Sequence, residues 1–211
     1  MSREESRQMS ARMQKKLARK KRRQSILIAT VFVCAILLVG IGFWGTKKSL
    51  TKQAKVTCIV EYTDEIRTAA EENGLEPAYV AAVVMAESSY RTDAVSSANA
   101  QGLMQLLPST AEWIAGKFDE TYSDGVLFDV ETNLRYGCWY LGWLMRRYDG
   151  DMKCASSAYH AGQGTVDTWL ANAEYSSDGK TLDVIPFDST RIYVERVLKY
   201  YEKYEEIYAD S

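Results

Sequence analysis

The sequence predicts an all-α domain preceded by a single transmembrane helix. A run of twenty residues without a charge, 26–45, follows a strongly basic N-terminus. In the region after it, apolar residues recur at helical spacing, and Gly, Asn and Pro interrupt them where helices would end or begin. We find no convincing strand and no internal repeat. At 211 residues, the chain can hold one ordinary domain beside the anchor.

The N-terminal region predicts a membrane anchor of defined orientation. Residues 1–24 form a basic tail that holds ten of the 26 Lys and Arg residues, and the segment 25–45 follows it. As a helix rising about 1.5 Å per residue, that segment spans a hydrocarbon core of about 30 Å. It is too long for the apolar core of a cleaved signal peptide. Because Lys and Arg stay on the cytoplasmic side, we expect an uncleaved signal anchor in the plasma membrane, with the N-terminus in the cytoplasm and the rest of the chain outside.

The basic tail is explained by this topology and by anionic lipid, so no nucleic-acid partner is expected. Residues 46–60 show no clear period and predict a short stalk. The external domain, 61–211, has the usual size of a single domain. Between its helices, residues 89–107 are polar and glycine-punctuated and predict a loop. The helices expected in the domain are 62–72, 77–88, 108–117, 130–148, 152–161, 165–171 and 190–208.

Start and stop signals support these helices. Gly74 follows the first helix as a C-terminal stop, and Pro77 suits the first turn of the second. Asp129 and Asp151 each stand where an N-cap acceptor is needed. Gly162 ends the helix that Asp151 begins.

The cysteines and the single histidine give no metal site. Cys34 lies in the predicted span, and Cys58, Cys138 and Cys154 lie outside it, with no C-x-x-C pair among them. Cys138 and Cys154 are compatible with a disulfide or with buried free thiols. No metal or organic cofactor is expected.

Glu87 is the best catalytic candidate in the chain. It closes an apolar helical run, 80–86, and a carboxylic acid in apolar surroundings is pushed towards its protonated form, which donates a proton at neutral pH. The alternative without a catalytic role is a surface ion pair with Arg91, four residues on. In the following loop, Ser96 and Gln105 offer hydrogen bonds to hydroxyls and amides. This inventory suits a carbohydrate ligand.

An ordered set of motifs resembles a known family. The elements are Glu87-Ser88, Gly-Leu-Met-Gln at 102–105 with Pro108, the segment 133–141, Ala-Tyr-His-Ala-Gly at 158–162 and Thr-Arg-Ile-Tyr-Val at 190–194. Their order resembles the soluble lytic transglycosylase (SLT) family of peptidoglycan-cleaving domains, which have a lysozyme-like, goose-type α-helical fold. The resemblance covers about residues 62–208.

The resemblance implies a role for each matching residue. Glu87 is the sole catalytic acid/base. Ser96 and Gln105 line the saccharide groove, and Tyr159 lies beside the reaction centre. His160 joins these as a substrate-binding residue where the family usually has asparagine. The sequence around it also allows a half-buried histidine that lies behind the residues in contact with substrate. Ser189 departs from the family too, because an acidic residue usually precedes the Thr-Arg pair.

The implied reaction cleaves the β-1,4 bond between N-acetylmuramic acid and N-acetylglucosamine and leaves a 1,6-anhydro end. A glycosidase with two carboxylates would need a partner for Glu87. Asp93 is the only other nearby carboxylate before residue 112, and we expect it to cap or brace the loop. A lysozyme-type hydrolase on the same fold and an inactive wall-binding or scaffold module are the alternatives. The expected partners are peptidoglycan strands and the membrane, and the anchor also allows a place in a secretion or other cell-envelope complex.

Overall fold

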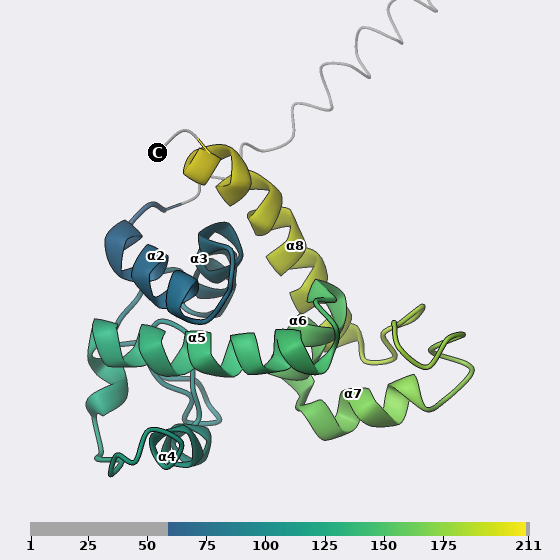
Figure 1. The fold of residues 1–211 in the computed structure, drawn as a ribbon, viewed down its shortest axis with the longest axis horizontal. Helices are drawn as coiled ribbons and strands as arrows, with labels where there is room; N and C mark the ends of the chain where they lie inside the picture. The colour runs from purple at the N-terminus through teal and green to yellow at the C-terminus, as the bar shows by residue number, and fades with distance from the viewer. Residues whose placement is uncertain (1–58, 210–211) are drawn as a thin grey trace, which may run out of the picture. The chain divides into compact units, whose positions relative to one another are not determined.

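The computed structural model describes residues 59–209, in which seven α-helices and one 3₁₀ helix surround a central apolar core (Figure 1). Two isolated bridges, Val95 with Gln101 and Gln101 with Leu106, are the only extended pairing in this part of the chain. The elements are α2 (Thr63–Glu72), α3 (Pro77–Glu87), α4 (Pro108–Ala115), η1 (Val126–Phe128), α5 (Val130–Arg147), α6 (Met152–Ala161), α7 (Gln163–Leu170) and α8 (Asp188–Ala209). The all-α prediction is therefore confirmed for the described domain.

The predicted tail, 1–24, and the predicted span, 25–45, lie outside the described residues, as does nearly all of the stalk. Between residues 59 and 209, none of the helices combines the length and the apolar character that a bilayer crossing requires. The membrane anchor thus stays a prediction from the sequence.

The helix signals act as expected. Gly74 follows α2 with a positive φ of 65°, and Pro77 is the first residue of α3. The side chain of Asp129 accepts a hydrogen bond from the backbone N–H of Thr132 at 2.9 Å and thereby caps α5. Asp151 caps α6 in the same way through the N–H of Cys154. The remaining differences are shifts of about two residues, since α4 ends at 115 and α7 and α8 begin at 163 and 188, which is usual at frayed helix ends.

Helix α3 is the centre of the domain. Eight of its eleven residues are buried, and they are apolar around the whole circumference, as expected for a helix enclosed by others. It packs against α8 and α2, and the Tyr79 hydroxyl shares a 2.8 Å hydrogen bond with Ser156 of α6. This enclosure fixes the C-terminal end of α3, where Glu87 lies.

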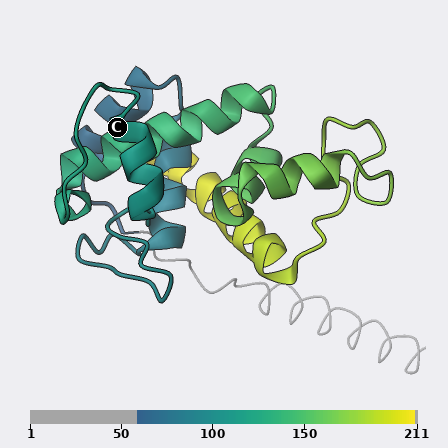
Figure 2. The ribbon, with the colours of Figure 1, turned by 90° about the horizontal axis from the view of Figure 1, so that it is seen from below.

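A second, smaller core joins α4 and η1 to α5. Its buried members are Leu106, Ala111, Ile114, Ala115, Leu127 and Tyr136. In Figure 1, α4 lies on the side of α5 opposite α2, and Figure 2 shows α4 in front of α5 when the domain is seen from below. The segment between α3 and α4 therefore passes from the main core to the smaller one across α5.

Candidate active site

Glu87 is the last residue of α3, and its side chain is half-buried. Burial raises the pKa of its carboxyl from 4.5 to about 7, because the surroundings disfavour the charged form. The Tyr193 hydroxyl and, to a smaller extent, the positive charge of Arg196 oppose this rise. Near neutral pH, both the protonated and the ionised form of the carboxyl are therefore accessible, and the group can act as either acid or base.

The alternative of an ion pair with Arg91 does not occur. Within residues 59–209, no salt bridge includes Glu87. The Arg91 Nε instead donates a hydrogen bond to the backbone carbonyl of Ser88 at 3.1 Å. The Glu87 carboxyl is therefore available for proton transfer.

Two tyrosines accompany Glu87. Burial raises the pKa of both Tyr159 and Tyr193, and the nearby charge of Glu87 raises it further. The Tyr159 hydroxyl donates a hydrogen bond to the Met104 carbonyl at 2.8 Å. The Tyr193 hydroxyl is buried and has no hydrogen bond of normal geometry with the described residues, yet it lies close enough to Glu87 to influence its proton. The family resemblance predicts Tyr159 beside the reaction centre, whereas no signal in the sequence gives Tyr193 a role.

His160 lies over Tyr193 on the exposed side. The two rings stack with centroids 4.7 Å apart, and His160 Nδ1 shares a hydrogen bond with the Thr190 hydroxyl at 3.1 Å. Partial burial lowers the pKa of His160, and Arg196 lowers it further, so the ring is neutral at pH 7. His160 thus belongs to the surroundings of Glu87 through Tyr193, and part of the residue stays exposed to solvent.

The turn at 102–105 is held by a residue that the sequence analysis did not single out. Asn133 of α5 is buried, and its amide donates to the carbonyls of Gln101 and Leu127 while accepting from the N–H of Met104. A Cβ on Gly102 would overlap Asn133 and the Leu127 carbonyl. Only glycine therefore allows this close approach.

Ser96 and Gln105 lie in this loop and also stabilise it. The Gln105 side-chain amide donates to the carbonyls of Ala94 and Gly102 at 3.0 and 2.9 Å. The Ser96 hydroxyl accepts a hydrogen bond from the N–H of Ala100 at 3.0 Å. The bracing role expected of Asp93 is wrong, because its exposed side chain makes no hydrogen bond with any residue of the described domain.

The two cysteines of the described domain are free. Cys138 and Cys154 are buried thiols and do not form a disulfide with each other. Burial raises the pKa of both, to about 12 for Cys154. Burial thus disfavours the reactive thiolate at these two positions. Cys58 lies outside the described residues.

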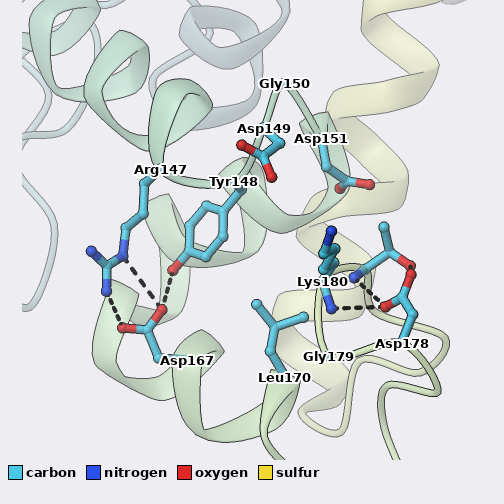
Figure 3. A pocket seen from close by; sticks show the side chains of 11 residues that line it. Arg147, Tyr148, Asp149, Gly150, Asp151, Asp167, Leu170, Asp178, Gly179 and Lys180 are labelled. Atoms are coloured by element: carbon cyan, nitrogen blue, oxygen red, sulfur yellow. Dashed lines mark hydrogen bonds and ion pairs between the residues drawn. The ribbon is translucent and has the colours of Figure 1, made fainter.

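A cavity of about 640 Å³ opens elsewhere, between the ends of α5 and α7 and the loop that follows α7 (Figure 3). Two of its carboxylates have partners, since Arg147 pairs with Asp167 and the Asp178 carboxylate accepts backbone N–H bonds from Lys180 and Thr181. These bonds lower the pKa of Asp178 to about 2. Such an ionised acid is a poor proton donor, and none of the predicted site residues lines this cavity.

Comparison with known proteins connects the described domain to one family. A family model described as "Transglycosylase SLT domain" matches residues 64–181. The soluble lytic murein transglycosylase of Escherichia coli K12 is 34% identical over 153 residues, which are 71% of this chain and 24% of the relative. The membrane-bound lytic murein transglycosylase C of Serratia proteamaculans is 34% identical over 117 residues, covering 50% of this chain and 32% of that protein.

Solved structures agree with these relatives. An inactive variant of the lytic transglycosylase Slt from Pseudomonas aeruginosa superposes with a TM-score of 0.67 at 31% identity, covering 76% of this chain and 27% of that one. The 70 kDa soluble lytic transglycosylase of Escherichia coli gives a TM-score of 0.64 at 30% identity, covering 71% and 25%. This chain spans about a quarter of the length of these proteins. The expected lysozyme-like helical fold is confirmed, and the chain belongs to the transglycosylase SLT domain family.

Proposed function

We propose that this chain is a membrane-anchored lytic transglycosylase that cleaves the β-1,4 bond between N-acetylmuramic acid and N-acetylglucosamine in peptidoglycan. The observation that carries the proposal is the half-buried Glu87 carboxyl, whose pKa is raised to about 7 and which forms no ion pair in the described domain. Family membership and the names of the relatives support the substrate class.

The reaction uses Glu87 twice. In its protonated form, Glu87 gives its proton to the leaving glycosidic oxygen as the bond from that oxygen to carbon 1 of the muramic acid breaks. The acetamido oxygen of the same sugar stabilises carbon 1 in place of a second carboxylate. The Glu87 carboxylate then takes the proton of the hydroxyl on carbon 6, whose oxygen bonds to carbon 1. A 1,6-anhydro ring forms, no water is consumed, and Glu87 is protonated again.

The surroundings of Glu87 suit this route better than the two-carboxylate route. The groups that interact with its charge include Tyr193, Arg196 and Tyr159, and none of these three carries a carboxyl group. Asp93, the other candidate, is exposed in the loop. We propose that Ser96, Gln105, Tyr159 and His160 contact the saccharide around Glu87.

The anchor completes the proposal. The uncharged run 26–45 behind a basic tail supports a position of the domain outside the plasma membrane, where peptidoglycan lies. Protease added to intact protoplasts should remove the domain of the full-length chain and leave the N-terminal tail protected. Protection of the domain would contradict this topology.

The chemical step is tested with purified glycan strands digested in water enriched in heavy oxygen. The proposal predicts products that end in 1,6-anhydro sugars and carry no label, because no water enters the bond. Label at a new reducing end would instead identify a hydrolase on the same fold. Binding to wall sacculi without release of any soluble fragment would identify a wall-binding module.

A further inference from the structure

Helices α4 and α5 present a group of aromatic side chains that the proposed reaction does not use. Trp113 of α4 lies against Trp139, Tyr140 and Trp143 of α5, with ring centroids 5.3, 6.2 and 5.8 Å away. We call these four residues the aromatic patch. Trp113 is 40% exposed, and the other three are half-buried. An exposed tryptophan amid further aromatic rings is typical of a binding surface.

The aromatic patch is continuous with the candidate active site. The Tyr140 ring lies 5.5 Å from the ring of Tyr159, whose pKa responds to the charge of Glu87. The Tyr140 hydroxyl donates a hydrogen bond to the Gln163 side chain at 3.1 Å, at the beginning of α7. From Tyr159, the rings therefore lead through Tyr140 to Trp143 and Trp113, away from the reaction centre.

Two rings of the aromatic patch each have a cation beside them. The Lys117 ammonium lies 5.4 Å from the centre of the Trp113 ring, and no carboxylate in residues 59–209 pairs with it. The Arg147 guanidinium lies 5.6 Å from the centre of the Trp143 ring and pairs with Asp167. Lys117 is thus a positive charge beside an exposed ring, and it can meet an anionic group of a bound molecule.

We propose that the aromatic patch is an additional glycan-binding site, which holds sugar rings of the same peptidoglycan strand beyond those at Glu87. This inference rests on the proposed function. The C–H face of a pyranose ring is apolar and covers an aromatic ring, while its hydroxyls stay at the rim in water. The peptide stems of the strand carry carboxylates, which suit Lys117. Continuity with Tyr159 favours the strand over an unrelated protein partner.

The first test is protection of Trp113 from oxidation. The full-length chain carrying Glu87→Gln is treated with N-bromosuccinimide, with and without N-acetylglucosamine oligomers of three to seven sugars, and the oxidised tryptophans are identified by peptide mass. The proposal expects the longer oligomers to slow oxidation of Trp113 several-fold. Trp169 is 5% exposed and serves as the internal reference. Equal oxidation of Trp113 with and without the longest oligomer overturns the proposal.

The second test is a matched pair of substitutions. Trp113→Leu keeps an apolar side chain but removes the ring, and Phe128→Leu makes the same kind of change at a residue that is also 40% exposed but outside the aromatic patch. In calorimetric titrations of the Glu87→Gln chain, affinity should rise with oligomer length. Trp113→Leu should remove most of this rise, by about tenfold for the longest oligomer, and Phe128→Leu should keep it. An unchanged dependence on length in folded Trp113→Leu contradicts the proposal.

The outcomes separate this proposal from the proposed function. If Glu87→Gln abolishes cleavage of wall glycan but Trp113 is neither protected nor needed for length-dependent affinity, the aromatic-patch proposal fails alone. If cleavage survives Glu87→Gln, the proposed function fails, whatever Trp113 does. Protection by muropeptides alone, and not by the sugar oligomers, would assign the patch to the peptide stems and overturn the glycan assignment.

Discussion

Glu87 and Asp178 are both acidic side chains, but their surroundings shift their pKa values in opposite directions. Glu87 ends a buried helix, and burial raises its pKa to about 7. Asp178 lies in an exposed turn, and hydrogen bonds from Thr181 and Lys180 lower its pKa to about 2. A proton donor at neutral pH needs the first environment, since the second keeps the acid ionised.

The cavity and the Glu87 region are also two candidates for the active site, and they differ in what supports each. The open cavity of Figure 3 has Asp178 at its wall, whereas the Glu87 region is distinguished by the state of one carboxyl and by the tyrosines around it. As the active site, shape alone therefore favours the cavity, whereas the protonation of the carboxyl favours the Glu87 region. The predictions below test which criterion is right.

The largest expected effect separates the two acids directly. Glu87→Gln should lower cleavage of wall glycan by about 10²–10⁴-fold or more, because it removes the group that both donates and accepts the proton. Asp178→Asn, the matched change in the cavity, should keep the parent rate. Both rates are measured by release of soluble fragments from sacculi. A loss in the Asp178 variant with activity kept in the Glu87 variant would reverse the comparison.

The second effect concerns pH. The first step needs protonated Glu87, so kcat/KM should fall as the pH rises through about 7 and should decrease about tenfold per unit at higher pH. A site built on an acid such as Asp178 would lose its protonated form already above pH 2. The measurement is the initial rate on soluble glycan strands between pH 5 and 9. A rate that stays flat from pH 6 to 9 would exclude Glu87 as the acid of the rate-limiting step.

Much of the helical fold could be predicted from local signals. Asp129, Asp151 and Gly162 act within one turn of their own position, so their caps and stops depend little on the rest of the chain. The apolar spacing along the chain could not show that α3 packs against α8, because that contact joins segments about a hundred residues apart. Only the family resemblance implied this packing, through the lysozyme-like fold.

In the candidate site, too, some residues could be predicted from local sequence and others depend on contacts across the fold. Glu87 could be predicted, because its apolar run and the motif after it are continuous in sequence. Tyr193 and Asn133 lie in the recognised motifs, but their roles depend on contacts across the fold, to Glu87 and to the loop at 101–104. The bracing role expected of Asp93 belongs to Gln105, because loop backbone geometry decides which side chain braces a turn.

The third effect is on stability, and its sign differs between the two acids. The pKa of Glu87 is higher in the folded state, so the related stability is full below pH 4.5 and is lost as the pH rises through about 7. Glu87→Gln removes that loss. The variant should therefore have a higher free energy of unfolding than the parent at pH 8, by at most about 3 kcal/mol, and a higher unfolding temperature there, with little difference at pH 4.

Asp178→Asn should behave in the opposite way. The pKa of Asp178 is lower in the folded state, so its contribution is present above about pH 4 and is lost as the pH falls through about 2. The variant should be slightly less stable than the parent at pH 6, and the difference should shrink towards pH 3. Thermal unfolding followed by circular dichroism measures both variants. The same sign for both at neutral pH would contradict the assigned environments.

The smallest effect sharpens the account of Glu87 itself. The Tyr193 hydroxyl lowers the pKa of Glu87, so Tyr193→Phe should raise that pKa and move the alkaline fall of kcat/KM to higher pH, by up to about one unit. Tyr175→Phe, at a half-buried tyrosine of the loop after α7, is the control and should leave the fall where it is in the parent. A merely structural role for Tyr193 would lower the rate equally at every pH. An unshifted fall in a folded Tyr193→Phe variant would mean that its hydroxyl does not act on the proton of Glu87.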